Sequence, residues 1–339
     1  MKLSWEKLSL RPDVPFRTSR AVQKLAERVW ARIELDGLEG WGEADPSPYY
    51  GESAETVAEA LDRMRPVLAS APDPDHLEAI ESRLCETVPG NGSAHAAVSA
   101  ALHDLFGKRA GMPVWQLLGL DPADAPLSSF TIGIDEPAAM AERVRKMSGW
   151  PILKIKLGTD RDREIVEAIR EADESRRLQV DANAAWTPDE AIRNIQMLAE
   201  LGVEMVEQPL PPGDATAWRR VRDSSPIPIY ADESCIRSSD VPGLKGLVDG
   251  VNIKLAKCGG IREAVRAVHT ARACGLEVMF GCMLESTLGI AAAAHIAPLA
   301  DRLDLDGAAL LAEDPFTGPT VRDSRLYLGP EPGLGVRPA

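Results

Sequence analysis

The second part of the chain alternates short apolar runs with amphipathic helical stretches, and this rhythm constrains the fold most. A representative helical stretch is AspArgGluIleValGluAlaIleArgGluAla, residues 162–172. Repeated βα units of this size imply parallel strands, and seven or eight of them close most economically into a barrel rather than an open sheet. The sequence therefore predicts an α/β fold with a (β/α)-barrel. Its expected strands are residues 127–134, 151–158, 178–184, 203–208, 227–232, 249–255, 277–283 and 303–310.

The first part of the chain has a different pattern. Residues 2–10 and 28–36 have the composition of strands, and GlyLeuGluGlyTrpGlyGluAla supplies a glycine turn and a further short strand. A polar loop, residues 11–24, lies between the first two strands. Helical spacing then follows in residues 54–70, 75–87 and 93–109. We expect an α+β domain over residues 1–120, joined by the C-terminal segment 317–339, and a barrel domain over residues 121–316.

Composition limits the classes of partner. The 339 residues carry 38 Lys and Arg against 52 Asp and Glu, a formal net charge of −14. Phosphate binding needs clustered Lys and Arg, so this balance argues against nucleic acid. No apolar run reaches the roughly 20 residues that cross a bilayer, and the N-terminus lacks a signal-peptide core. The cysteines form no CxxC pair and suit reduced thiols, so we expect a cytoplasmic protein without a membrane partner or a zinc site.

Charged or polar residues stand at the end of the predicted barrel strands, where each loop begins. They follow one another at intervals of roughly 25 residues, about one βα unit each. In a barrel the carboxyl ends of all strands meet at one mouth, where barrel enzymes keep their active sites. We therefore expect these side chains to lie together: Lys156, Asp181, Glu207, Asp232, Lys254, Cys282, Asp304 and Asp306.

Three carboxylates of this set, Asp181, Glu207 and Asp232, belong to three successive predicted strands. Converging carboxylates repel one another unless a cation lies among them. With no imidazole or thiolate in the set, the expected ion is hard and prefers oxygen ligands, which favours Mg²⁺ over Mn²⁺ or Ca²⁺. The alternative is that each acid caps a helix or bonds a neighbouring loop, but the matched positions on three strands favour one Mg²⁺ per chain.

Lys154 and Lys156 of ProIleLeuLysIleLysLeuGly point to the same face of a strand, because side chains alternate along it. Lys156 and Lys254 would face each other across the barrel, with the carboxylate strands between them. Two bases on opposite sides of a metal can each reach one face of a substrate carbon, and Mg²⁺ can stabilise the enediolate formed when an α-proton leaves. Lys154 would help to hold the substrate carboxylate. The alternative is that the lysines only neutralise the acids.

Five segments in this order resemble the enolase superfamily in its muconate-lactonising-enzyme-like subgroup: LysIleLys, AspAlaAsn, GluGlnPro, AlaAspGluSer and AsnIleLysLeuAlaLysCysGlyGlyIle. The similarity covers nearly the whole chain. It implies a modified TIM barrel, (β/α)7β, with an N-terminal α+β capping domain. It also implies Mg²⁺ bound by the three acids, acid/base roles for Lys156 and Lys254, and supporting roles for Asn183 and Glu233.

The last predicted strand narrows the substrate class. Asp304-Leu305-Asp306-Gly307 resembles the AspXxxAsp motif with which dipeptide epimerases bind the α-ammonium group of their substrate. Two carboxylates on one face that the metal does not use would in any case attract a cation. An ordinary pair of strand-end or helix-cap acids is the alternative.

Other segments resemble pocket loops of dipeptide epimerases, namely ProTyrTyrGlyGluSer at 48–53 and GlyCysMetLeuGluSer at 281–286, which contains Cys282 and Met283. Thr131 matches a position that contacts substrate in those enzymes. Arg20, in the polar loop of the capping domain, could pair with a glutamate side chain in the C-terminal residue of the dipeptide. A solvent-exposed Arg20 is the alternative.

The sequence thus predicts a Mg²⁺-dependent dipeptide epimerase. It would invert the α-carbon of the C-terminal residue by a two-base 1,1-proton transfer, with L-Ala-D-Glu and L-Ala-L-Glu as the expected pair and cell-wall peptide recycling as the setting. Other dipeptide specificities stay open, as do muconate cycloisomerase, o-succinylbenzoate synthase and N-acylamino acid racemase activities and a homo-oligomeric state. Cycloisomerase and synthase substrates carry no ammonium group, so they give Asp304 and Asp306 no role. A non-catalytic binding protein that keeps the barrel would not need bases on both faces.

Overall fold

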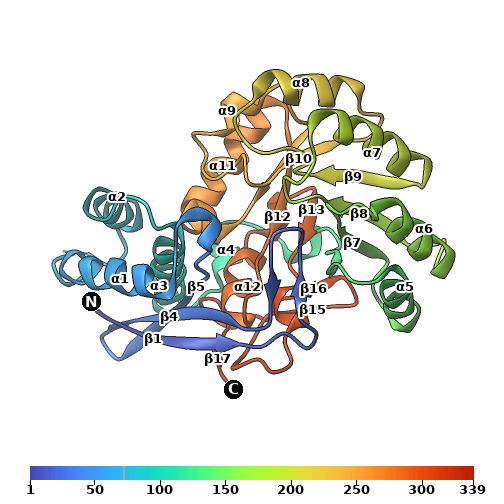
Figure 1. Ribbon diagram of the computed structural model, residues 1–339. Helices are drawn as coiled ribbons and strands as arrows, with labels where there is room; N and C mark the ends of the chain where they lie inside the picture. The colour runs from blue at the N-terminus through green and yellow to red at the C-terminus, as the bar shows by residue number, and fades with distance from the viewer. Residues whose placement is uncertain (72) are drawn as a thin grey trace.

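The computed structural model describes residues 1–71 and 73–339. The N-terminal elements, blue to cyan in Figure 1, form a group beside the larger barrel, whose strands and outer helices run from green to orange. Within the described residues, no helix combines the length and apolar character needed to cross a membrane.

The N-terminal group is a three-stranded antiparallel sheet packed against helices, in the order β1 (Lys2–Leu10), β4 (Ala26–Leu35) and β5 (Leu38–Ala44). Its longest helix, α3 (Gly92–Ala110), lies directly on β5, where a Cβ at Gly40 or Gly42 would come within 2.0 Å of a backbone oxygen of α3. The glycines of β5 therefore allow a backbone approach that side chains would block. Helices α1 (Ala54–Ala69) and α2 (Leu77–Thr87) complete this group.

The polar segment 11–24 is not entirely a loop, so that prediction is wrong in part. It contains a short hairpin of β2 (Phe16–Arg17) and β3 (Val22–Gln23), closed by a hydrogen bond from Thr18 N to Ala21 O of 2.9 Å. Ile134 N, just after the first barrel strand, donates to Arg17 O at 2.8 Å. This contact holds the hairpin against the mouth of the barrel.

Eight parallel strands form the barrel, each bonded to the next in chain order. A parallel bridge between Ser128 and Leu303 joins the first strand region to the last and closes the ring. Strands four places apart therefore lie on opposite sides. The strands are β6 (Phe130–Ile132), β7 (Ile152–Lys156), β8 (Arg177–Asp181), β9 (Val203–Glu207), β10 (Ile229–Ala231), β11 (Gly250–Ile253), β12 (Glu277–Gly281) and β13 (Arg302–Asp304).

Helices follow the strands and cover the outside of the barrel (Figure 1). Helix α7 shows how the sequence starts such a helix. Thr187 is its N-cap and Pro188 is its first residue, and Glu190 Oε2 accepts a hydrogen bond from Thr187 N at 2.8 Å. The helices of the barrel region are α5 (Pro137–Lys146), α6 (Asp162–Ala172), α7 (Pro188–Glu200), α8 (Ala215–Ser224), α9 (Val241–Leu244), α10 (Leu255–Cys258), α11 (Ile261–Cys274) and α12 (Thr287–Ala294).

The strand expected at 303–310 is wrong beyond its start. Strand β13 ends at Asp304, and Gly307–Leu310 forms the 3-10 helix η4. Asp306 has φ −91° and ψ 1°, and its carbonyl accepts from Ala309 N at 2.9 Å, so the chain turns there. Asp304 and Asp306 consequently do not belong to one continuous strand.

The C-terminal segment runs back toward the N-terminal group. Strand β14 (Phe316–Thr317) pairs with β17 (Arg337–Pro338), and β15 (Thr320–Arg322) pairs with β16 (Arg325–Tyr327). Leu334 N donates to Asp104 Oδ1 of α3 at 2.8 Å, and the short helix α4 (Val114–Leu117) links α3 to the barrel. The domain boundaries 1–120 and 121–316 stay predictions.

Candidate active site

A cavity of about 640 Å³ opens at the carboxyl ends of the barrel strands. Its walls come from both parts of the chain: Arg20 and Tyr49 from the N-terminal part, and Lys156, Lys254 and Asp306 from the barrel. Six of the eight strand-end side chains expected to lie together line this cavity: Lys156, Asp232, Lys254, Cys282, Asp304 and Asp306. Asp181 and Glu207 lie behind this wall, next to Asp232.

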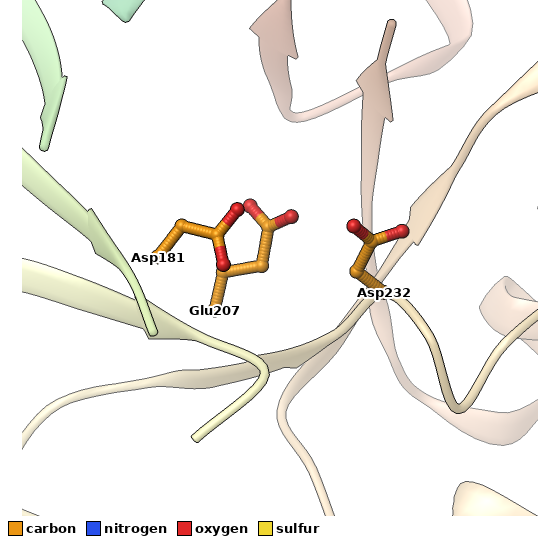
Figure 2. A group of neighbouring side chains, drawn as sticks. All are labelled: Asp181, Glu207 and Asp232. Carbon is orange, nitrogen blue, oxygen red and sulfur yellow. The ribbon is translucent and has the colours of Figure 1, made fainter. Parts of the chain in front are cut away.

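Three buried carboxylates lie at its base. Asp181 ends β8, Glu207 ends β9 and Asp232 directly follows β10, and each offers an oxygen within 4.8 Å of the others. Figure 2 shows the three side chains projecting from neighbouring strands into the same space. Oxygen donors alone, held this close, fit a hard divalent cation.

Lysines determine the charge state of these acids. Burial acts to raise the pKa of Asp181, but Lys156 and Lys154 outweigh burial and lower this pKa to about 2. Burial also acts to raise the pKa of Asp232, but Lys254 and Lys257 outweigh burial and lower this pKa well below the usual range. Both acids are therefore anionic at neutral pH.

Glu207 differs from its two neighbours. Burial raises its pKa to about 7, although Lys154 opposes this shift. Its Oε2 lies 2.7 Å from Lys154 Nζ but makes no hydrogen bond of acceptable angle with any described residue. A buried oxygen without a hydrogen-bond donor is what a metal ligand presents before its ion is bound, so the donor set fits Mg²⁺.

Lys156 and Lys254 lie on opposite sides of the barrel, because β7 and β11 are separated by three strands on one side and by three on the other. Lys156 Nζ is 2.6 Å from Asp181 Oδ2, and Lys254 Nζ is 2.8 Å from Asp232 Oδ2. Burial would lower the pKa of Lys254, but Asp232 outweighs burial and raises it. Both ammonium groups thus border the cavity and face the carboxylate cluster.

Lys154 lies deeper than the sequence analysis expected. It is 1% exposed and is absent from the cavity wall, and its Nζ contacts Asp304 Oδ2 at 2.8 Å. Side-chain alternation along β7 correctly predicts that Lys154 and Lys156 lie on the same face. Two residues of strand span about 6.6 Å, however, so Lys154 lies that much deeper in the barrel than Lys156. Lys154 therefore neutralises buried acids beneath the cavity.

Asp304 and Asp306 both line the cavity but have different environments. Asp304 accepts from Lys154 and, through Oδ1, from Ser129 Oγ at 2.8 Å. Asp306 Oδ2 accepts from Thr131 N at 2.5 Å, and Asp306 forms no ion pair with any described residue. Burial and the neighbouring Asp304 raise the pKa of Asp306 to about 7. Asp306 is therefore the carboxylate with the greater capacity to bind an added cation.

Arg20 lines the cavity and is also 38% exposed at its side chain. Its Nη1 is 2.5 Å from Glu233 Oε1, and its guanidinium lies 4.4 Å above the ring of Tyr49. Asn183 joins this group to the acids, since its Nδ2 donates to Asp181 Oδ2 at 3.2 Å and to Glu233 Oε1 at 3.4 Å. The cation of Arg20 is thus partly neutralised by Glu233.

Cys282 and Met283 line the cavity, in a segment that the N-terminal sheet contacts. Arg28 Nε, from β4, donates to Leu284 O at 3.0 Å, and Arg28 Nη2 is 2.7 Å from Asp45.

No sequence pattern predicted a role for Arg28 or Asp45. Strand β4 has four charged residues, and Arg28 differs from Glu27, Arg32 and Glu34 in being buried. Burial is a property of the fold, so the sequence contained no signal for Arg28.

Lys257 is a further residue for which no role was predicted from the sequence. It lies three residues after Lys254, is 3% exposed and contacts Asp232 Oδ1 at 2.5 Å. A second lysine so close to Lys254 in the sequence was the signal.

Comparison with protein families fits this architecture. Residues 6–119 match the model of the mandelate racemase / muconate lactonizing enzyme N-terminal domain, and residues 136–339 match the enolase C-terminal domain-like model. The chain belongs to this enolase-type family. Both the family resemblance and the barrel with an N-terminal domain are thereby confirmed.

Several relatives named as epimerases are similar over most of their length. The L-Ala-D/L-Glu epimerase of Bacteroides thetaiotaomicron is 40% identical, over 99% of this chain and 88% of that protein. The hydrophobic dipeptide epimerase of Flavobacteria bacterium is 39% identical, over 99% of this chain and 98% of that protein.

Solved structures of the family show the same fold. The dipeptide epimerase of Enterococcus faecalis, complexed with Mg and L-Leu-L-Tyr, has a TM-score of 0.92 and 35% identity, covering 99% of this chain and 98% of that one. The muconate lactonizing enzyme of Pseudomonas fluorescens, complexed with muconolactone, has a TM-score of 0.94 and 32% identity, covering 100% and 96%. Because both activities share the fold, the fold alone does not identify the substrate.

Proposed function

We propose that this chain is a Mg²⁺-dependent dipeptide epimerase that inverts the α-carbon of the C-terminal residue, with L-Ala-D-Glu and L-Ala-L-Glu as the first substrate pair. One observation carries the proposal: Lys156 and Lys254 border one cavity from opposite sides, and Asp306 in the same cavity has no ion-pair partner within residues 1–71 and 73–339. Two opposed acid/base groups suit inversion at one carbon, and a free carboxylate suits an α-ammonium group. The relatives named as dipeptide epimerases support this reading.

The three carboxylates Asp181, Glu207 and Asp232 would hold the Mg²⁺. When bound, this ion supplies positive charge that stabilises the negative charge developing on the substrate carboxylate. All three acids are buried, and charge interactions are stronger in such surroundings than in water.

Lys156 and Lys254 would move the proton. One lysine, in its neutral form, takes the α-proton and becomes an ammonium group, while the other, already an ammonium group, gives a proton to the opposite face and becomes neutral. Exchange with solvent then restores the starting protonation states. In the reverse direction the two lysines exchange roles, so the enzyme interconverts the two epimers.

Asp306, with Asp304 beside it, would bind the α-ammonium group. Thr131, Cys282 and Met283 would contact the dipeptide from the walls, and Asn183 and Glu233 would support the acids and Arg20. Lys154 would act below the cavity as a counter-ion and not as a direct substrate contact.

Arg20 would bind the glutamate side chain. This requires Arg20 to share its charge between the substrate and Glu233, which lies 2.5 Å from its Nη1.

A second specificity has its own observation. Val22 and Leu25 are 53% and 52% exposed, and both line the cavity on the hairpin side. Because Glu233 already partly neutralises Arg20, an apolar C-terminal residue packed on Val22 and Leu25 is the alternative substrate class. Relatives named hydrophobic dipeptide epimerases agree with this alternative.

A dipeptide panel in deuterated water tests the proposal. With Mg²⁺ present, mass spectrometry should show one deuterium gained at the α-carbon of the C-terminal residue, fastest for Ala-Glu or for Ala with an apolar residue. Lys156→Ala and Lys254→Ala should each abolish epimerisation. If no dipeptide exchanges its α-proton, the epimerase proposal fails. Cell-wall peptide recycling, a cytoplasmic location and a homo-oligomeric state stay predictions.

A further inference from the structure

Two lysines hold the two oxygens of one carboxylate. Lys254 Nζ is 2.8 Å from Asp232 Oδ2, and Lys257 Nζ is 2.5 Å from Asp232 Oδ1. The lysines stand three residues apart, just before and within the one-turn helix α10, and such a spacing brings side chains to the same side of a helix. Asp232 is therefore fixed from both of its oxygens.

The two lysines differ in what else they bind. Lys257 Nζ also donates to the backbone oxygens of Asp232, Cys235 and Asn252, at 2.6, 2.9 and 3.0 Å. An ammonium group has three hydrogens, so the protein uses all of those on Lys257. Among the described residues, Lys254 Nζ has a single hydrogen-bond acceptor, Asp232 Oδ2.

The lysines also differ in position. Lys254 borders the cavity, whereas Lys257 is buried behind Asp232 and is absent from the cavity wall. Of the two, Lys254 can leave Asp232 and still reach solvent or substrate, and Lys257 has no such alternative.

We propose that Lys257 is a positioning residue that holds Asp232 Oδ1, so that Oδ2 is presented to the cation of the carboxylate cluster in place of Lys254. This rests on the proposed function, because it takes Asp181, Glu207 and Asp232 as the Mg²⁺ site. Cation binding then detaches Lys254 from Asp232 and leaves its Nζ directed to the cavity. Lys257 keeps its contact throughout.

The proposal predicts opposite effects for the same substitution at the two lysines. Lys254→Met removes the group that competes for Oδ2, so Mg²⁺ should bind more tightly. Lys257→Met leaves Asp232 without its anchor, so Mg²⁺ should bind about 10- to 100-fold more weakly, the usual cost of losing a residue that orients a metal ligand. If Lys257 were only a counter-ion, its removal would also strengthen binding, because a repelling positive charge would be lost.

Titration calorimetry of Mg²⁺ into metal-stripped protein measures these effects without reference to activity. Lys245→Met is the matched control, since Lys245 is exposed and its side chain has no hydrogen bond or ion pair with described residues. Equal or tighter binding by Lys257→Met, or weaker binding by Lys254→Met, overturns the inference. If the wild-type protein binds no Mg²⁺, the proposed function fails with it, which is a separate and recognisable result.

Lys257→Met also removes the donor of three backbone carbonyls, so circular dichroism and thermal unfolding must accompany the titration. If that variant does not fold, structures of the wild-type protein with and without Mg²⁺ decide the question. We expect Lys257 Nζ to stay on Asp232 Oδ1 in both, and Lys254 Nζ to leave Oδ2 when Mg²⁺ is bound. A Lys257 that moves away, or a Lys254 that stays, overturns the inference.

Discussion

Replacing Asp306 by Asn tests which group of the substrate this carboxylate binds. Asp306 is 2% exposed, so solvent screens its charge little, and Asn keeps both its size and an acceptor for Thr131 N. Asp304 cannot take over, because Lys154 already neutralises it. A hydrogen bond to a charged group contributes about 1.5–3 kcal/mol, so kcat/KM for a free dipeptide should fall roughly 10- to 150-fold.

The assay compares L-Ala-L-Glu with its N-acetyl derivative, which carries no ammonium group. In the wild-type protein, kcat/KM should be lower for the acetylated dipeptide than for the free one. In Asp306→Asn the two kcat/KM values should be similar, because the interaction with the ammonium group is already lost. Asp160→Asn, at an exposed position, is the control. If Asp306→Asn keeps wild-type kcat/KM for the free dipeptide, or if the two losses simply multiply, Asp306 does not bind the ammonium group.

The remaining predictions concern the metal, specificity, packing and pH. Removing divalent cations with EDTA should abolish α-proton exchange, and added Mg²⁺ should restore it; exchange that persists in EDTA would contradict the metal site. Arg20→Met should raise KM for Ala-Glu roughly tenfold and leave KM for Ala-Leu nearly unchanged, and equal changes in both would exclude a role in side-chain recognition. Gly42→Ala places a Cβ 2.0 Å from Ala97 O, so urea unfolding should show a loss of about 1–3 kcal/mol or more. Burial raises the pKa of Glu81 to about 8, so this group stabilises the fold at acidic pH and loses that contribution as pH rises from about 4.3 through 8. Glu81→Gln should therefore gain stability relative to the wild-type protein between pH 5 and pH 8, whereas the exposed Glu59→Gln should not.

Local pattern was enough to locate the strand ends of the barrel. Three strands of the structure end at residues that the sequence predicted as strand ends: Lys156, Asp181 and Glu207. The prediction succeeded because the end of an apolar run in a βα unit marks the end of a parallel strand. The same reasoning failed after Asp304, where Gly307 lies so close to the loop after β12 that a Cβ would be 2.4 Å from Met283 O. That close approach brings together segments about two dozen residues apart in the sequence. The periodicity of a single strand carries no information about such a contact.

Contacts between distant segments account for most of what the sequence did not predict. Arg28 reaches Leu284 across 256 positions of the chain, and Arg20 reaches Glu233 across 213. Nothing in the residues near Arg28 specifies that partner. The depth of Lys154 within the barrel was not predicted either. Side-chain alternation places Lys154 on the inner face of β7, but it does not show that Lys154 lies below the cavity.

The hairpin of β2 and β3 has a consequence for how new specificities could arise. Arg20 and Val22 of the hairpin and Leu25 just after it line the cavity, while every lysine and carboxylate proposed for proton transfer and metal binding lies at the end of a barrel strand or directly after it. The residues proposed to recognise the C-terminal side chain of the substrate are therefore encoded in a different stretch of sequence from those proposed for the chemistry. A hairpin grafted from a relative could redirect the enzyme to another dipeptide without altering a residue of its catalytic machinery.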